Sequence, residues 1–204
     1  MTIAIIGAGN VGKALAKAFT QKGESVVFGV QEPAKYQSNN STIPAVIVAE
    51  AVAQAQIVIL AVPYAATESI ARSIADWGGK VLVDATNPLA AGLSGLSVGT
   101  TDSGAETIAR AANNARVVKA FNTTGAEHMA DSRYASGQIV MPICGDDAAA
   151  RQQVMALATL IGFEAVDMGA LSAARYIEPF AMTWIHLALK QGYGRNFAFG
   201  LLKR

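Results

Sequence analysis

Three glycines near the start of the chain, spaced as Gly7-x-Gly9-x-x-Gly12, point most directly to chemistry. They follow an apolar run typical of a strand and precede a run with helical periodicity. The first glycine permits a tight turn, the second lets the backbone approach a pyrophosphate, and the third lets the helix pack on the strand. The helix N-terminus adds unpaired N–H groups for an anion. We predict a dinucleotide site formed by Gly7, Ala8, Gly9, Asn10, Val11 and Gly12; the alternative is a glycine-rich turn that binds nothing.

A second candidate position follows the second expected strand, where a carboxylate usually binds the adenosine ribose of NAD. Here the chain reads Phe28-Gly-Val-Gln-Glu32. Glu32 could bind the ribose of NAD, or Gln31 and Lys35 could contact the 2′-phosphate of NADP. The third possibility is a solvated turn without a ligand.

Small and amide-bearing residues follow the next three expected strands. Ala61, Val62 and Pro63 end one of them, and Pro63 marks where the chain leaves the sheet because proline cannot continue a central strand. Tyr64 follows, either to stack on a ring or to pack. Asn87 and Asn122, with Thr123, end the other two strands. These uncharged groups suit the carboxamide of a nicotinamide, but they also suit ordinary loop capping.

Groups for proton transfer are scarce in this chain. The sequence shows no paired carboxylates, no nucleophile elbow and no metal-ligand spacing, so we assign neither a metal site nor a catalytic residue. We expect Lys119 to form an ion pair rather than act as a catalytic amine, His186 to be a core residue and His128 to lie on the surface. The lone Cys144 is expected to be a small buried hydrophobe.

Strand and helix patterns alternate through the first two-thirds of the chain, which predicts an α/β fold with parallel strands joined by crossovers. We expect a Rossmann-type, doubly wound, mostly parallel sheet over residues 1–167. The expected strands are Ile3–Ile6, Ser25–Phe28, Ile57–Leu60, Lys80–Val83, Arg116–Lys119, Ile139–Cys144 and, at an edge, Glu164–Asp167. The expected helices are Val11–Lys22, Pro44–Gln54, Ala65–Asp76, Gly104–Ala112 and Asp146–Leu160.

The remainder, residues 168–204, is too short for an independent domain and is expected to be a small helical appendage. Its long apolar helix, Leu171–Lys190, should be broken or kinked near Pro179. We expect the appendage to close over the cofactor site or to form a homodimer contact, because it is more apolar than a small appendage can bury. The segment 87–103 has no periodicity and begins at the carboxyl edge of the sheet, where a functional loop is expected.

Composition excludes several classes of protein. The chain has 204 residues, of which 52% are hydrophobic and 15% are charged, which argues against disorder. A net charge of +1 gives no reason to expect nucleic acid or an acidic membrane as a partner. We see no signal peptide or membrane span, so a cytoplasmic location is expected.

Five motifs in order resemble the NADP oxidoreductases that depend on coenzyme F-420, and the cytosolic reductase domain of the STEAP-type metalloreductases. They are GAGNVG from Gly7, DATNP from Asp84, VVKAFNT from Val117, CGDD from Cys144 and DMGALSAAR from Asp167. The resemblance spans nearly the whole chain. It implies a Rossmann domain that binds NADP(H) and exchanges a hydride with a deazaflavin or flavin over the nicotinamide.

The resemblance also implies roles for particular residues. Gly7–Gly12 would hold the pyrophosphate, Val62 and Pro63 would line the nicotinamide, and Ala120, Phe121 and Asn122 would face them. Residues 171–175 would help to form the second cofactor's pocket. One position departs from the family pattern: an arginine that grips the 2′-phosphate is commonly found where this chain has Gln31, and neutral glutamine cannot make that charged contact. NAD is therefore not excluded.

These observations favour a reductase that passes a hydride from a reduced nicotinamide to F-420 or to a flavin. One alternative is a dehydrogenase of a small organic substrate, with Lys119 or His186 as its acid or base. The other is a dinucleotide-sensing module without turnover.

Overall fold

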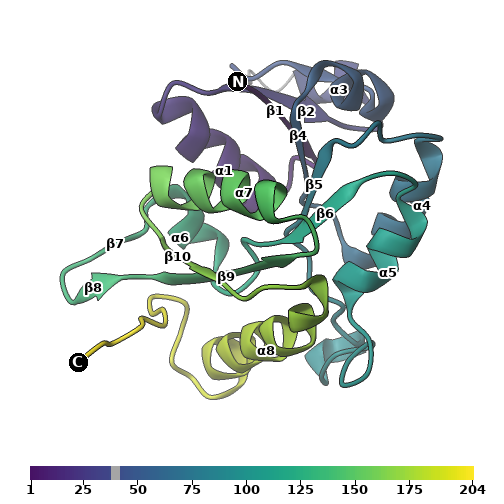
Figure 1. Ribbon diagram of the computed structural model, residues 1–204. Helices are drawn as coiled ribbons and strands as arrows, with labels where there is room; N and C mark the ends of the chain where they lie inside the picture. The colour runs from purple at the N-terminus through teal and green to yellow at the C-terminus, as the bar shows by residue number, and fades with distance from the viewer. Residues whose placement is uncertain (38–41) are drawn as a thin grey trace.

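The computed structural model describes residues 1–37 and 42–204, and its centre is one eight-stranded sheet with helices on both faces (Figure 1). The strand order is β10-β9-β6-β5-β4-β1-β2-β3. All neighbouring strands are parallel except β6 and β9, which are antiparallel. From β3 to β6 this is the strand order of a doubly wound dinucleotide-binding sheet, as the sequence predicts. The strands are β1 (Thr2–Ile6), β2 (Ser25–Gly29), β3 (Ala45–Val46), β4 (Ile57–Leu60), β5 (Val81–Asp84), β6 (Arg116–Lys119), β9 (Val140–Gly145) and β10 (Glu164–Asp167). A separate hairpin pairs β7 (Arg133–Tyr134) with β8 (Gly137–Gln138).

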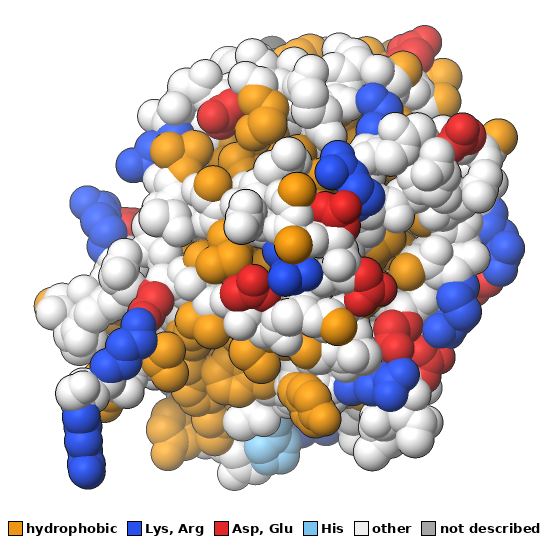
Figure 2. Space-filling view, viewed as in Figure 1, with side chains coloured by type: hydrophobic (Ala, Val, Ile, Leu, Met, Phe, Trp, Pro, Cys, Tyr) orange, Lys and Arg blue, Asp and Glu red, His pale blue; other side chains and the backbone are white. Residues whose placement is uncertain are grey.

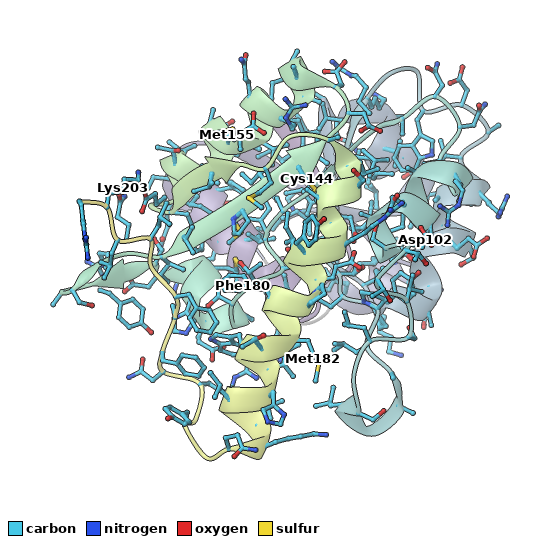
Figure 3. The ribbon with its side chains drawn as sticks, turned by 60° about the horizontal axis from the view of Figure 1, so that its bottom comes forward. Asp102, Cys144, Met155, Phe180, Met182 and Lys203 are labelled. Carbon is cyan, nitrogen blue, oxygen red and sulfur yellow. The ribbon has the colours of Figure 1, made fainter. Side chains whose placement is uncertain are left out.

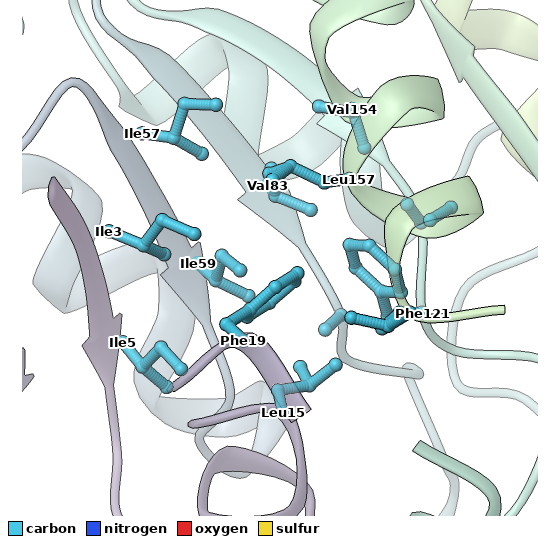
Figure 4. Packing of buried hydrophobic residues seen from close by; sticks show 14 of the residues in the cluster. Ile3, Ile5, Leu15, Phe19, Ile57, Ile59, Val83, Phe121, Val154 and Leu157 are labelled. Atoms are coloured by element: carbon cyan, nitrogen blue, oxygen red, sulfur yellow. The ribbon is translucent and has the colours of Figure 1, made fainter. Parts of the chain in front are cut away.

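Alternate residues of the strands enter two separate hydrophobic cores, because side chains of a strand point to opposite faces. Ile3 and Ile5 of β1 pack with Leu15 and Phe19 of α1 in one core (Figure 4), while the intervening Ala4 belongs to the other core. The sheet is therefore apolar on both faces, which explains the continuous apolar strand sequences. The helices are α1 (Asn10–Gln21), α2 (Pro33–Gln37), α3 (Val48–Gln54), α4 (Thr67–Ser73), α5 (Gly104–Ala111), α6 (Ala126–Ala130), α7 (Ala148–Leu160) and α8 (Ala174–Lys190), with short 3₁₀ turns at Tyr64–Ala66, Ala91–Leu93 and Leu171–Ala173.

Two expected elements differ from the structure. The expected helix Pro44–Gln54 begins only at Val48, because Ala45 and Val46 form a short strand against β2. Pro44 supplies only its carbonyl oxygen, to the Phe28 N–H at 2.9 Å, as suits a proline at the start of an edge strand. The helix expected to be broken or kinked near Pro179 is not broken: α8 continues through this residue, which lies in its second turn.

The C-terminal residues 168–204 lie against the β9–β10 end of the sheet (Figures 1 and 3). The tail after α8 runs back beside that helix, and the ring of Phe199 lies 4.8 Å from that of Phe180. The Trp184 indole donates a hydrogen bond to the Phe197 carbonyl at 2.8 Å. Residues 197–199 of the tail are thus packed against the helix, whereas residues 200–204 are exposed.

Candidate functional site

The turn between β1 and α1 requires glycine at two positions. Gly7 has φ +103°, and a Cβ there would lie 2.5 Å from the Ala61 carbonyl oxygen. A Cβ on Gly12 would collide with the Gly7 carbonyl oxygen. The β1 strand end, α1 and the end of β4 therefore meet more closely than any other residue type allows.

Gly9 has a different environment, because a Cβ there would meet no protein atom within 4 Å. Gly9 is the N-cap residue of α1; no side chain caps this helix, and its first turn contains no acidic residue. The first N–H groups of α1 are therefore available to an external acceptor. This open space beside a helix N-terminus fits a pyrophosphate.

A cavity of about 640 Å³ adjoins this turn at the carboxyl edge of the sheet. Four of the predicted site residues line it: Val11, Val62, Pro63 and Asn87. The other six lining residues are not among the predicted site residues, although the sequence pattern singles out Tyr64 and the 87–103 loop. These six are Tyr64, Ala65, Ala85, Thr86, Leu89 and Ser97. The cavity therefore extends from the first turn of α1 to the loop after β5.

Asn87 and Asn122 form a reciprocal amide pair at the end of this cavity. The Asn87 Nδ2 donates to the Asn122 carbonyl at 2.9 Å, and the Asn122 Nδ2 donates to the Asn87 Oδ1 at 2.9 Å. This leaves the Asn122 Oδ1 buried without a hydrogen-bond partner. A buried acceptor of this kind is costly unless a donor reaches it. The primary amide of a nicotinamide is a donor of the right chemistry.

The other residues predicted after β6 are directed into the protein. Ala120 and Phe121 are fully buried, and the Phe121 ring lies edge-on to Phe19 with the centroids 6.1 Å apart. Phe121 has φ +62°, an unusual conformation for an aromatic residue, which turns the chain sharply before Asn122. Thr123 is also buried, with its Oγ1 3.7 Å from the Met141 Sδ. Neither Ala120 nor Phe121 lines the cavity.

Gln31 and Glu32 are exposed just after β2, and Lys35 lies on α2. The Glu32 carboxylate and the Lys35 ammonium form an exposed ion pair at 3.7 Å. These residues lie at the strand end where an adenosine ribose would lie, next to the turn at Gly7, whose N–H donates to the Gly29 carbonyl. Their chemistry therefore leaves both NAD and NADP open.

Lys119 forms ion pairs, as expected, in a fully buried cluster with Asp84 and Glu178. Burial by itself would lower the pKa of Lys119, but the two carboxylates outweigh it and hold the pKa above its ordinary value. Tyr64, beside this cluster, has a raised pKa because of burial and the nearby Glu178 and Asp84 carboxylates. Lys119 is therefore a charged amine that does not line the cavity, because its neighbours separate it from that space.

Both histidine expectations are wrong. His186 is exposed on α8, with its Nε2 3.0 Å from the Gln191 amide, so it is not a core residue. His128 is buried, and its Nε2 lies 2.9 Å from the Arg195 carbonyl. Cys144 is buried as expected, and burial raises the pKa of its thiol to about 12. Among residues 1–37 and 42–204, no cluster of His, Cys, Asp and Glu could hold a metal ion.

Sequence reasoning missed two members of the buried cluster, Asp84 and Glu178. Asp84 ends a strand whose other residues are apolar, and the strands pair so that Asp84 lies opposite Lys119. A carboxylate and an amine at matching positions of adjacent buried strands were therefore a usable signal. No comparable signal identified Glu178, which comes from a helix far away in the sequence.

The fold and the site define a Rossmann-type protein, and comparisons with known proteins identify its family. The family model "NADP oxidoreductase coenzyme F420-dependent" matches residues 2–88. The F420-dependent NADP reductase of Methanothermobacter marburgensis is 32% identical over 93% of this chain and 93% of its own. A crystal structure from Arthrobacter sp. FB24, ascribed to an F420-dependent NADP reductase, is 30% identical, covers all of both chains and has a TM-score of 0.88. This chain belongs to the F420-dependent NADP reductase family of oxidoreductases.

Metalloreductase STEAP3 of Rattus norvegicus is also similar, with 32% identity over 86% of this chain. The match covers only 35% of the STEAP3 chain, so the chain spans about a third of that relative. In the described part of this chain, no helix is long and apolar enough to cross a membrane.

Proposed function

We propose that this protein transfers a hydride between NADP(H) and a deazaflavin or flavin, with coenzyme F-420 as the first candidate acceptor. The observation that carries this proposal is the continuity between the open N-terminus of α1 and the uncharged cavity, which share Val11. When bound, the nicotinamide supplies the hydride. The protein's task is to hold two rings in contact, and this task requires orientation rather than proton transfer.

Each part of the dinucleotide has a proposed set of contacts. The backbone from Gly7 to Gly12 holds the pyrophosphate, and Gln31, Glu32 and Lys35 contact the adenosine end. Ala61, Val62 and Pro63 lie along one side of the nicotinamide, and the end of β6 lies opposite, where Ala120 and Phe121 hold Asn122 in place and Asn122 makes the contact. The Asn122 Oδ1 and the Asn87 side chain bind its carboxamide. Because Gln31 carries no charge, we propose that NADH is also accepted.

Two broader features belong to the same proposal. Residues 1–167 form the dinucleotide-binding unit, and residues 168–204 form an appendage through which two copies associate as a homodimer. The protein works in the cytoplasm, where reduced nicotinamide is available as donor.

The test is the oxidation of NADPH and of NADH, side by side, with F-420, FMN and FAD as acceptors. We expect turnover with at least one acceptor and a modest preference between the two nucleotides. If neither nucleotide binds and no acceptor is reduced, the proposal fails. Nucleotide binding without turnover of any acceptor would favour a sensor or a dehydrogenase of a small substrate instead.

A further inference from the structure

A buried charge cluster joins the C-terminal helix to the wall of the cavity. The Lys119 Nζ lies 2.7 Å from the Asp84 Oδ2 and 3.0 Å from the Glu178 Oε1, and it donates to the Thr86 carbonyl at 2.6 Å. The three charged side chains are at most 1% exposed. They come from β6, β5 and α8, so the cluster unites elements that are distant in the sequence.

The charges of the cluster are balanced by a helix N-terminus. Two carboxylates and one ammonium leave an excess negative charge, and Glu178 also accepts hydrogen bonds from the first N–H groups of α5. Its Oε2 accepts from the Gly104 N–H at 2.9 Å and its Oε1 accepts from the Ala105 N–H at 3.1 Å. The partial positive charge of the α5 N-terminus thus stabilises the Glu178 carboxylate.

The space around Gly104 is too small for a side chain, so the Glu178 carboxylate and the start of α5 fit closely together. A Cβ at Gly104 would lie 2.9 Å from the Tyr64 ring and 3.2 Å from the Glu178 Oε1. A buried ion cluster is seldom more stabilising than well-packed apolar side chains of the same volume. Stability alone therefore does not account for the cluster, and its effect on neighbouring residues is the more informative property.

The cluster ends at Thr86, which lines the cavity. The Thr86 N–H and Oγ1 donate to the Asp84 Oδ1 at 2.9 and 2.7 Å, and its carbonyl accepts from Lys119. Every polar group of Thr86 is therefore held by the cluster. Asn87, the next residue, also lines the cavity and pairs with Asn122. The conformation of the cavity wall thus depends on Lys119 and on its partner Glu178.

We propose that Glu178 and Lys119 are positioning residues that, through Thr86, fix the part of the cavity that receives the nicotinamide end of the dinucleotide. This inference rests on the proposed function. It predicts that disrupting the cluster weakens binding of the whole dinucleotide but not of its adenosine half, which binds at the end of β2 and at the pyrophosphate position beside it, away from the cluster.

The experiment measures, by calorimetry, the dissociation constants of NADP⁺ and of 2′,5′-ADP, a fragment without the nicotinamide. For Glu178→Gln and Lys119→Met, we expect the affinity for NADP⁺ to fall about tenfold and that for 2′,5′-ADP to change less than about twofold. In turnover assays of these two variants, we expect kcat to fall and the KM for the nucleotide to rise. The control is Arg110→Met, which removes an exposed ion pair with Asp102 beside α5 and should leave both affinities unchanged.

If a variant with an unpaired buried charge does not fold, Thr86→Val provides a second test, because it removes only the hydroxyl bond to Asp84. Thr86→Val should lower the affinity for NADP⁺ but not for 2′,5′-ADP, and by a smaller factor than the two cluster variants. Equal losses for both ligands, or no loss for either, in a folded variant would overturn the inference while leaving the proposed function intact. If the wild type binds NAD⁺ in preference, NAD⁺ and ADP replace the two ligands. A wild type that binds no nucleotide overturns both.

Discussion

The three glycines of the first turn carry different constraints, although they belong to one motif. Gly12 faces the Gly7 carbonyl, whereas Gly9 faces open space. We expect Gly12→Ala to lower the melting temperature, because its Cβ has no room without movement of the turn. We expect Gly9→Ala to leave the melting temperature unchanged and to weaken nucleotide binding at least tenfold, because its Cβ occupies the proposed pyrophosphate position. Thermal unfolding and calorimetry on the two variants measure this difference. Tight nucleotide binding by Gly9→Ala would exclude the proposed position.

Gln31 is the residue at which the choice between NADP and NAD is most open to change. Replacing it by arginine supplies a charged, bidentate donor for the 2′-phosphate. We expect Gln31→Arg to raise the ratio of kcat/KM for NADPH over NADH about tenfold, which is about 1.4 kcal/mol of discrimination. Gln31→Leu, which has no charge, is the control and should not raise the ratio. An unchanged ratio in the arginine variant would mean that the adenosine end lies elsewhere.

Sequence patterns identified the backbone part of the site better than its side-chain part. The glycine spacing and the strand ends followed from local chemistry, and four of the predicted residues line the cavity. The roles of His128, His186 and Glu178 depend on which elements pack together, and periodicity does not contain that information. His128 is buried because the C-terminal tail returns to it, and the Arg195 carbonyl lies 2.9 Å from its ring.

At the scale of elements, an ion pair between Glu106 and Arg175 joins α5 to α8. Ser103 caps α5 and accepts from the Glu106 N–H, while Glu106 binds Arg175 of α8 at 2.6 Å. The Arg175 guanidinium and the Ser103 hydroxyl lower the pKa of Glu106, despite partial burial. Because the folded pKa of Glu106 is lowered, this pair stabilises the fold above the ordinary glutamate pKa of 4.5, and the stabilisation is lost as pH falls below it.

We therefore expect Arg175→Met to lower the free energy of unfolding at pH 6, with the difference from the wild type shrinking between about pH 4.5 and pH 3. Urea unfolding at several pH values measures this. Arg72→Met, which breaks the exposed pair with Glu68, is the control and should have little effect at any pH. A difference that stays constant down to pH 3 would contradict the role assigned to Glu106.

Element types were predictable where the apolar period was long and uninterrupted, as in β1, α1 and α7. The segment at Pro44 was not, because Ala45 and Val46 gain their hydrogen bonds only from the open edge of β2. The local sequence pattern also could not predict that α8 continues through Pro179. The proline removes one hydrogen bond early in the helix, and burial of Ile177, Ala181 and Trp184 holds the helix together on both sides of it.

At the scale of the whole molecule, an apolar surface on the C-terminal side is left uncovered. A groove of about 490 Å³ lies between α8, the β9–β10 end of the sheet and the C-terminal tail, and Phe180 and Phe199 contribute to its lining. Figure 2 shows hydrophobic side chains gathered over α8 and the tail. Tyr176 is 73% exposed there, and Leu202 is 94% exposed near the chain end. A contiguous apolar face of this kind is typical of an interface between proteins.

The proposed homodimer uses this face, since one patch that pairs with itself across a two-fold axis buries the exposed side chains of both copies. We expect light scattering at micromolar concentration to give twice the chain mass of 21.1 kDa. Tyr176→Lys places a charge in the centre of the contact and should give the monomer mass without loss of secondary structure. Leu160→Lys is the matched control, because Leu160 is an exposed apolar residue at the end of α7, away from this face, and its replacement should leave the dimer intact. A monomeric wild type would refute the dimer, and a Tyr176→Lys dimer would move the contact to another face. Because Tyr176 belongs neither to the proposed dinucleotide contacts nor to the cluster of Lys119, Asp84 and Glu178, the monomeric variant should still bind the nucleotide, which separates assembly from cofactor binding.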